Sequence, residues 1–138
     1  MATWKGRIVV STSARIAAVN ITREVAAELE GGTVKDGLLC VSVRHATCAL
    51  ALNEDEHGLR KDLERVAATL LSPIRRADPF LHDRIDDNAQ AHLTACVLGP
   101  SITVPLEDGR MLLGTWQSLL LVELDGPRSR TVDLTAAG

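Results

Sequence analysis

Hydrophobic and polar residues alternate over several short stretches of the chain, a pattern typical of strands that are buried on one face. Alternation and β-branched content predict strands at 4–10, 16–20, 38–45 and 48–54. Within 38–45, Leu39, Val41, Val43 and His45 fall on one face. Further along, the Glu107-Asp108-Gly109 turn predicts a hairpin between 101–106 and 110–113, and a last strand is predicted at 130–134.

One nearly continuous apolar run, in LGTWQSLLLVELDGPRSR (113–130), carries a polar residue close to each end. In strand geometry Gln117 and Glu123 share a face with Leu119 and Leu121. An isolated carboxylate is costly beside buried apolar residues, so we expect Glu123 to have a partner: an arginine, a histidine, a ligand or a metal. The alternative is a surface glutamate beside Arg128 or Arg130.

Two segments have helical periodicity. Thr22 is expected to cap a short helix at 23–30, which stops at the Gly31-Gly32 pair. The second helix, 58–73, has an apolar stripe formed by Leu59, Leu63, Val66 and Leu70, and Pro73 is expected to end it. Asp62 lies about 60° from Leu59 on this helix, so we expect it to point along a cleft.

The pattern is lost between 74 and 90, which predicts a long irregular connection of a kind that often carries function. The following segment, 91–99, is short and apolar and fits a strand or a helix equally well. Two or three helices among about eight strands, joined mainly by hairpins, predict a single α+β domain over 1–138, with a mixed or antiparallel sheet.

The composition of the chain argues against several classes of protein. The formal net charge is −3 and the chain has only three aromatic residues, so neither a duplex-binding surface nor a base-stacking platform is expected. No apolar span reaches membrane-crossing length and no signal peptide is visible, so a soluble cytoplasmic protein is expected. The three cysteines, Cys40, Cys48 and Cys96, lie in apolar runs without CxxC spacing and are expected to be reduced core thiols.

Several polar residues remain as candidates for a site. His82 and His92 bracket Asn88 in and after the irregular connection, where side chains can converge without disrupting a core. Arg128 and Arg130 lie on the same side of an extended chain, which favours phosphate or carboxylate binding, although a solvated basic edge is the commoner outcome. His57 is expected to be exposed, and none of the histidine spacings matches a zinc motif.

The motifs in their order resemble those of the YjbQ-like proteins. The resemblance is carried by HATCALALNE, the DL of the second helix, FLH, NAQAHL, LGPSITVPLEDGRMLLGTWQ and VELDGPRSR, from about Gly37 to the C-terminus. It implies an α+β fold assembled as a homotrimer, with the polar positions near the subunit boundary. The chain departs from the pattern at Gln90, where many relatives carry histidine or an acid, and at Phe80, where tyrosine is common.

The resemblance also assigns positions residue by residue. As catalytic candidates it implies His45, Asp62, His82, Asn88, His92 and Glu123, and as metal ligands the three histidines among them, His45, His82 and His92. As substrate-binding candidates it implies Asn53, Glu54, Gln117, Arg128 and Arg130, with Asp125 in the last motif. On this interpretation Gln117 and Glu123 form the floor of the site, and Arg128 and Arg130 form its anion-binding edge.

The activity implied by the family's usual name is a secondary thiamine-phosphate synthase, which joins hydroxymethylpyrimidine diphosphate to thiazole phosphate and releases pyrophosphate. Magnesium would suit the carboxylates Glu54, Asp62 and Glu123, whereas zinc would suit the imidazoles. Three imidazoles are more than a magnesium-pyrophosphate site requires. Two alternatives therefore stay open: a trimer that binds a metal or a small anionic metabolite without this reaction, and a polar network that only joins subunits.

Overall fold

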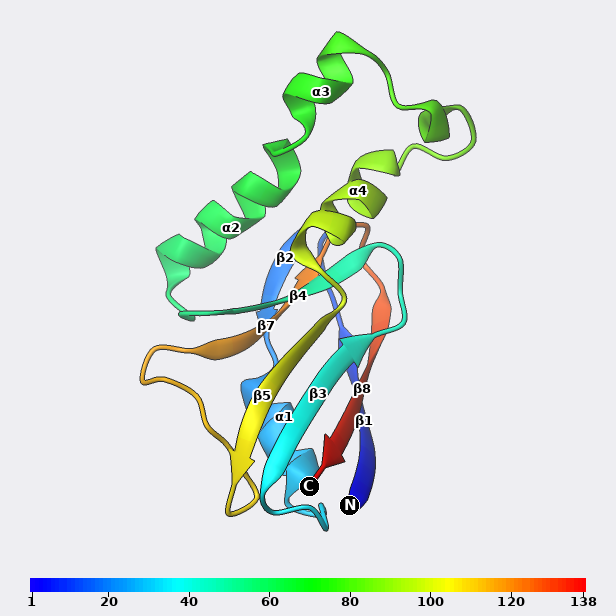
Figure 1. Cartoon of the computed structure of the whole chain (residues 1–138). Helices are drawn as coiled ribbons and strands as arrows, with labels where there is room; N and C mark the ends of the chain where they lie inside the picture. The colour runs from blue at the N-terminus through cyan, green and yellow to red at the C-terminus, as the bar shows by residue number, and fades with distance from the viewer.

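Eight strands form two antiparallel sheets, and four α-helices flank them, in a computed structural model that describes residues 1–138 (Figure 1). The strands are β1 (Thr3–Ser11), β2 (Ala17–Asn20), β3 (Gly37–Val43), β4 (Cys48–Asn53), β5 (Ser101–Glu107), β6 (Arg110–Met111), β7 (Ser118–Glu123) and β8 (Ser129–Ala137). The helices are α1 (Thr22–Leu29), α2 (His57–Thr69), α3 (Ser72–Ala77) and α4 (Ala89–Leu98), with a 3-10 turn, η1 (Leu81–Arg84). The expected α+β class with antiparallel pairing is confirmed.

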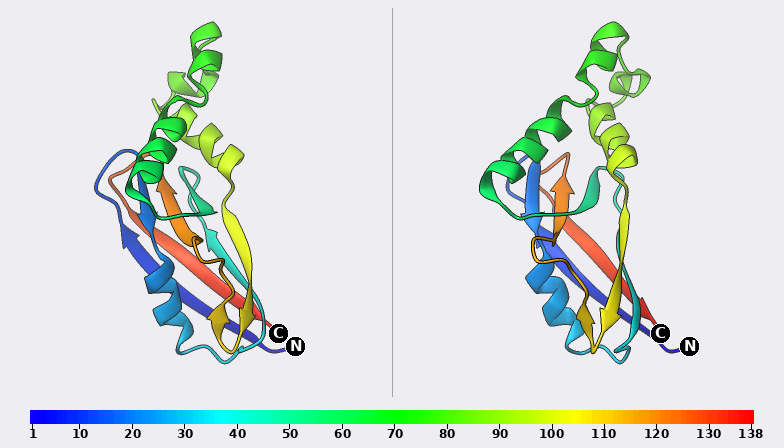
Figure 2. Two further views of the ribbon diagram at one scale, coloured as in Figure 1. Left: turned by 90° about the vertical axis from the view of Figure 1, so that its left-hand side faces the viewer. Right: turned by 60° about the vertical axis from the view of Figure 1, so that its left-hand side comes forward.

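The larger sheet has the order β1-β8-β3-β5-β6 and the smaller one β2-β7-β4. Figure 2 shows α2, α3 and α4 gathered at one end of the molecule, with both termini at the other. The termini are held together there, since the Ala2 N–H donates to the Gly138 carbonyl oxygen over 2.6 Å. The predicted hairpin is present as β5 and β6, turned by Asp108 and Gly109, both of which have positive φ.

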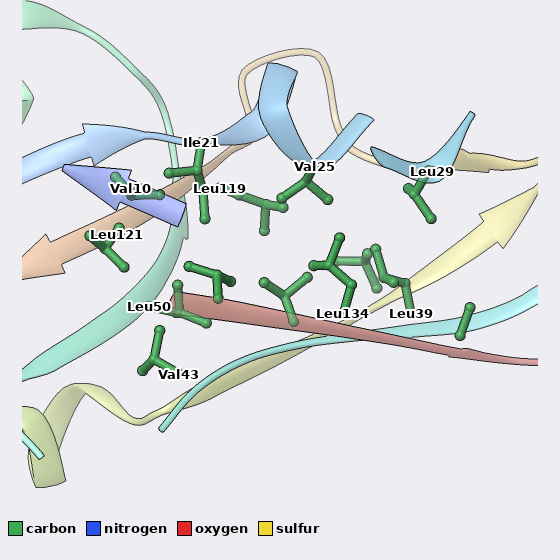
Figure 3. Close-up of a cluster of buried hydrophobic side chains, with 14 of the residues drawn as sticks. Val10, Ile21, Val25, Leu29, Leu39, Val43, Leu50, Leu119, Leu121 and Leu134 are labelled. Carbon is green, nitrogen blue, oxygen red and sulfur yellow. The ribbon is translucent and has the colours of Figure 1, made fainter. Parts of the chain in front are cut away.

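The main core lies between the two sheets and is closed on one side by α1 (Figure 3). Val25 and Leu29 of α1 face Leu39 and Leu134 of the larger sheet, while Leu119 and Leu121 enter from β7. All of these side chains are almost fully buried, so removing any one of them would leave a cavity costing about 2–5 kcal/mol.

A second apolar cluster covers the opposite face of the smaller sheet. Val122 of β7 and Ala49 of β4 contact Ala67 of α2 and Ala95 of α4. Strand β7 is therefore buried on both faces within one chain, which explains its continuous apolar run without a neighbouring subunit.

Thr22 does not cap α1 as predicted. It is the first residue of the helix, and its hydroxyl is used elsewhere: it donates to Asn20 Oδ1 at 2.7 Å and accepts from the Leu119 N–H at 2.9 Å. The hydroxyl thus ties the start of the helix to β7. The predicted end of α1 before Gly31 is confirmed.

The predicted apolar stripe of α2 is not its buried face. Leu59, Val66 and Leu70 are exposed, and the helix contacts the sheet through Leu63 and Ala67 instead. Because the Ala67 side chain is small, α2 can approach the sheet closely on the face that carries Ala67. That face is buried, and most of the predicted stripe beside it is not. Three large apolar side chains are left on the surface of the chain.

The connection predicted to be irregular contains α3 and η1. Pro73 does not end α2, which stops at Thr69; it lies in the first turn of α3, where a missing N–H costs nothing. The ambiguous segment 91–99 is helical up to Leu98, the last residue of α4, and Gly99 follows the helix as its C-cap. Small residues such as Ala91 and Ala95 are its buried positions while Leu93 and Val97 are exposed, so no periodic apolar pattern marked it as a helix.

Two outer strands have a carboxylate at their open edge. Glu28 of α1 accepts a hydrogen bond from the Arg7 N–H of β1 at 3.4 Å, and Glu64 of α2 accepts one from the Ala18 N–H of β2 at 3.1 Å. Both strands are sheet edges, where unpaired N–H groups would otherwise be open to another chain.

Of the three cysteines, only Cys48 is a core thiol. Cys40 is half-buried and Cys96 is exposed, so the expectation of burial is wrong for Cys96, although all three are free as expected. None of the helices combines the length and the apolar composition that a membrane-spanning helix requires.

Candidate active site

An open polar cleft of about 730 Å³ lies where three segments meet: the β3–β4 loop, the β7–β8 turn and the start of α4 (Figure 1). We call it the arginine cleft. Its lining residues are Arg44, His45, Ala46, Thr47, Asn88, His92, Asp125, Pro127, Arg128, Ser129 and Arg130. The charged members are three arginines and one aspartate.

Glu123 and Arg130 form a buried ion pair behind this cleft. Arg130 Nε donates to Glu123 Oε2 at 2.8 Å and Nη2 donates to Oε1 at 2.5 Å, and the two residues are 3% and 0% exposed. Glu123 ends β7 in the smaller sheet and Arg130 begins β8 in the larger one, so the pair ties the two sheets together. The predicted partner of Glu123 is thus an arginine.

Two threonines satisfy the remaining atoms of this pair. The Thr12 hydroxyl donates to Glu123 Oε2 at 2.8 Å and accepts from the Arg128 N–H at 2.9 Å. Thr47 accepts from Arg130 Nη2 through its carbonyl oxygen at 3.1 Å and its hydroxyl at 3.0 Å. The buried charges are therefore compensated by hydrogen bonds, as their removal from water requires.

The ionisation of this cluster follows from these contacts. Burial alone would raise the pKa of Glu123, but hydrogen bonds from Arg130, the Asp125 N–H and Thr12 outweigh it, so the pKa lies below its ordinary value. The neighbouring Cys48 thiol behaves oppositely: burial raises its pKa to about 11, only partly offset by Arg130. Glu123 is thus a charged structural acid and Cys48 an inert thiol.

A chain of hydrogen bonds links the turn to η1. Asp125 Oδ2 accepts from Arg128 Nη2 at 3.1 Å and from Asn88 Nδ2 at 3.2 Å, while Asn88 Oδ1 lies 3.2 Å from His82 Nε2. Burial opposes ionisation of Asp125, but these bonds and the charge of Arg128 prevail and lower its pKa. An ionised Asp125 can only accept, so Asn88 turns its amide N–H towards it, and His82 Nε2 must donate to Asn88 Oδ1.

The structure brings His82, Asn88 and His92 together, as their positions around the connection predict. The rings of His82 and His92 are edge to face, with centroids 5.0 Å apart. His92 lines the arginine cleft, and neither of its ring nitrogens is hydrogen-bonded within the chain. Among the candidate histidines, His92 therefore has the ring most available to a ligand.

His45 lies two residues beyond β3 rather than on its buried face. Its Nε2 accepts a hydrogen bond from the Thr131 N–H at 3.0 Å, and the ring lines the arginine cleft with His92. Nε2 of His45 and Nε2 of His82 are both in use, which leaves Nδ1 of each ring without a partner in the chain. Within one chain no group of three His, Cys, Asp or Glu side chains is placed to hold a metal ion.

Four predicted site residues lie elsewhere. Asn53, Glu54 and Asp62 border a cavity of about 200 Å³ beside Leu59 and Val66. Asp62 was expected to point along a cleft; it borders this cavity, is exposed and pairs with Arg65 at 3.1 Å, and it is not among the residues that line the arginine cleft.

Gln117 lies outside β7, in a turn where its Oε1 accepts from the Gly114 N–H at 2.8 Å. Six residues of extended chain, roughly 20 Å, separate it from Glu123. The prediction that Gln117 and Glu123 share one floor is therefore wrong for a single chain.

Three residues of the site escaped the sequence analysis. Arg44 and Thr47 flank His45 and lie in or beside the HATCA motif, so the motif itself contained the signal for them. Thr12 follows β1 in a polar turn that carries no distinguishing pattern. Its role depends on a contact across 111 residues of sequence.

Comparisons with known protein sequences identify relatives of this chain. The sequence profile described as "UPF0047 protein YjbQ-like" matches residues 6–138. A UPF0047 protein of Methanothermobacter thermautotrophicus is 42% identical over 127 residues, covering 92% of this chain and 87% of that protein. One from Archaeoglobus fulgidus is 41% identical over 129 residues, covering 94% and 98%.

Solved structures share the fold. A Sulfolobus solfataricus protein, described as YbjQ-like and of unknown function, superposes with a TM-score of 0.91 at 36% identity, covering 99% of this chain and 98% of that one. A hypothetical protein from Aeropyrum pernix gives a TM-score of 0.90 at 39% identity, covering 98% of each chain.

Proposed function

The chain belongs to the UPF0047, YjbQ-like protein family, and we propose that its arginine cleft binds a small phosphorylated or other anionic metabolite and supports a group-transfer reaction on it. The observation that carries this proposal is the makeup of the cleft: three arginines line it, and each is paired with a carboxylate through only part of its N–H groups. Planar guanidiniums are the side chains best suited to hold phosphate or carboxylate oxygens in pairs of hydrogen bonds.

Each arginine keeps part of its hydrogen-bonding capacity. Arg128 donates Nε to the Asp125 carbonyl oxygen at 2.8 Å and Nη2 to its carboxylate, and Arg130 donates Nε and Nη2 to its buried partners. In both guanidiniums Nη1 takes part in none of these bonds. Arg44 pairs with Asp133 through Nε at 2.6 Å, and its side chain is 67% exposed. These free N–H groups are the proposed anion-binding edge.

His92 is the proposed proton-transfer group. Its ring is free in the cleft and contacts His82, whose orientation is set through Asn88 and Asp125. An imidazole titrates near neutral pH and can give a proton to a leaving group or take one from a nucleophile. His82, Asn88 and Asp125 then act as positioning residues for it.

The candidate reaction is the formation of thiamine phosphate, which the family resemblance implies. The thiazole nitrogen attacks the pyrimidine methylene carbon, a C–N bond forms, the C–O bond breaks and its electron pair leaves with pyrophosphate. Such a step needs stabilisation of departing negative charge more than covalent help from the protein. Arg44, Arg128 and Arg130 would supply that stabilisation. Binding of an anionic metabolite without this reaction is the alternative.

We further propose that the site is completed in a homotrimer. The second group of predicted residues, Asn53, Glu54 and Asp62, lies at the far end of β4 and carries acids where the arginine cleft carries bases. Head-to-tail contact would join the two groups, and such contacts close into rings when the rotation allows. The exposed Leu59 and Val66 beside the acidic group would then be covered.

A divalent cation enters the proposal only in this assembled form. The imidazoles do not fit a metal site within one chain, because no three His, Cys, Asp or Glu side chains are placed to share an ion. Glu54 and Asp62 offer the oxygen ligands that magnesium prefers. Bound there, magnesium would neutralise phosphate charge; elemental analysis of the purified protein would show whether any metal accompanies it.

The binding test uses inorganic pyrophosphate as the probe and isothermal titration calorimetry as the measurement. Arg128→Gln should weaken binding at least about tenfold, the loss of one charge-assisted contact. Arg65→Gln, a matched exposed arginine on α2, should leave it unchanged. Equal affinity of wild type and Arg128→Gln would contradict the proposed site.

The reaction test supplies both thiamine precursors with magnesium and follows product. Arg128→Gln and Asp62→Asn are each expected to be inactive alone and to regain part of the activity when mixed and reassembled, because a trimer holding both variants contains some intact junctions. No recovery in mixed trimers would contradict a site shared between chains. Loss of the trimer in these variants, with wild-type protein binding no pyrophosphate, would favour the account in which the residues only join subunits.

A further inference from the structure

The His45 ring extends a sheet ladder beyond the point where its backbone pairing stops. Pairing between β3 and β8 ends at Val43 opposite Val132, and the next N–H of β8, that of Thr131, donates to His45 Nε2 at 3.0 Å. The side chain therefore satisfies a backbone donor that the strand no longer reaches. This contact fixes both the ring's position and its protonation.

A backbone N–H always donates, so the ring nitrogen facing it must hold a lone pair. In a neutral imidazole with a bare Nε2, the proton is on Nδ1. An imidazolium would place two N–H groups against each other. His82 is the opposite case, since its Nε2 must donate to Asn88 Oδ1.

The Nδ1 atom of His45 is open to the cleft. It has no hydrogen bond within the chain, and the only fully buried side-chain N or O atoms without a partner are Asp83 Oδ2 and Thr94 Oγ1. Since His45 lines the arginine cleft, its Nδ1–H is an unpaired donor on the cleft wall.

We infer that His45 acts as a neutral hydrogen-bond donor to an anionic ligand through Nδ1–H, and that it is neither a base nor a metal ligand through Nε2. The charged and titratable groups around it are Arg44, Arg128, Arg130, His92 and Asp125. Three of these are permanent cations, which oppose a further positive charge on the ring. The ring's role as a ligand donor rests on the proposed function, whereas its tautomer does not.

A neutral donor serves a different purpose from the arginines. It can contact a bridging or ester oxygen without drawing charge away from the guanidiniums. His45 is thus assigned a specificity role, and His92 the proton transfer.

The tautomer is tested by two-bond ¹H–¹⁵N correlation spectra of the ¹⁵N-labelled full chain, with the His45 signals identified in a His45→Gln variant. We expect a protonated Nδ1 and a bare Nε2 in His45, with His82 showing the opposite pattern. A bare Nδ1, or a proton on Nε2, would overturn the inference.

The donor role is tested with pyrophosphate in calorimetry. His45→Leu should weaken binding about tenfold, while His45→Gln, whose amide can accept from Thr131 and donate to the ligand, should retain affinity within about threefold. Wild-type affinity in His45→Leu would overturn the donor role even if the tautomer is as expected. If wild-type protein binds no pyrophosphate, the proposed function fails, and the tautomer is still decided by the spectra.

Discussion

Arg130 and Glu123 join the two sheets through an ion pair withdrawn from water, with Nε–Oε2 and Nη2–Oε1 distances of 2.8 and 2.5 Å. The same carboxylate accepts from the N–H groups of Leu124 and Asp125, at 2.9 and 3.0 Å, and so holds the start of the β7–β8 turn. The cleft wall is therefore built on a buried charge pair, and disturbing it changes both stability and site geometry.

Replacing Glu123 by glutamine should lower the free energy of unfolding by about 3–5 kcal/mol, because Arg130 would keep its charge without a partner. Urea denaturation at neutral pH measures this. Asp62→Asn is the control: its pair with Arg65 is exposed and should be worth less than about 1 kcal/mol. A loss below about 1 kcal/mol in Glu123→Gln would show that the pair is hydrated in solution.

The double variant Glu123→Leu with Arg130→Met should recover most of that loss, because no unpaired charge stays buried. It separates the cost of an orphaned charge from the value of the pair. If the double variant is as unstable as Glu123→Gln, the neighbouring hydrogen bonds to Thr12 and Thr47 are the main contribution.

Stability should fall on acidification below about pH 4.5, the ordinary value for Glu123. The pKa of both Glu123 and Asp125 is lower in the folded chain than its ordinary value. Such groups stabilise the fold above their unfolded pKa, and this is lost as pH falls through the folded pKa. Urea midpoints over a pH series would show a smaller acid loss in the Glu123→Leu, Arg130→Met variant. If the urea midpoint depends on pH equally in wild type and in this double variant, the acid loss does not come from Glu123.

Thr12→Val should destabilise the chain by about 1–3 kcal/mol, because the Arg128 N–H and Glu123 Oε2 both lose a buried partner. Thr12→Ser keeps the hydroxyl and should cost clearly less. Hydrogen exchange at the Arg128 amide gives a local measurement, and it should accelerate in the valine variant alone. Equal exchange rates of the Arg128 amide in both variants would show that the Thr12 hydroxyl does not stabilise the turn.

Gly126→Ala tests how closely the turn approaches its surroundings. A β-carbon there would lie 2.3 Å from the Ala14 carbonyl oxygen and 2.7 Å from Glu123 Cγ, so we expect a loss of about 1–3 kcal/mol and weaker pyrophosphate binding. At Gly31 the nearest atom, Glu28 O, would be 3.8 Å away, so Gly31→Ala should change stability by less than about 1 kcal/mol. The two variants should differ in thermal midpoint.

Thiol labelling of the native protein should detect one fast site, Cys96, which is exposed on α4. Cys48 should react only after unfolding, because it is buried and its pKa is raised to about 11. Cys96→Ser should remove the fast phase, and all three thiols should react in urea. A fast phase that persists in Cys96→Ser would mean that Cys40 or Cys48 is accessible.

Strands with strict alternation were predicted well because one buried face imposes a period of two. Leu39, Val41 and Val43 occupy the buried face that their spacing predicts. The buried faces of α2 and α4 were not predicted, because their fully buried positions, such as Ala67 and Ala95, are occupied by small residues. Propensity and periodicity detect large apolar side chains at regular spacing. A helix face that packs closely through small residues gives no such signal.

The site was predictable where neighbouring motifs supply it and unpredictable where distant segments do. His82, Asn88 and His92 are close in sequence, and the structure places them in contact. Gln117 and Glu123 share a strand run but lie at its opposite ends, a separation that face periodicity alone ignores. Thr12 could not be found, because its partner is far along the chain.

The carboxylates of Glu28 and Glu64 that occupy the open edges of β1 and β2 also limit how copies of this chain can meet. An incoming strand would have to displace a charged acceptor before it could pair with either edge, which disfavours fibrous stacking. Copies are left to associate through side-chain surfaces, whose charge and shape can specify one closed ring.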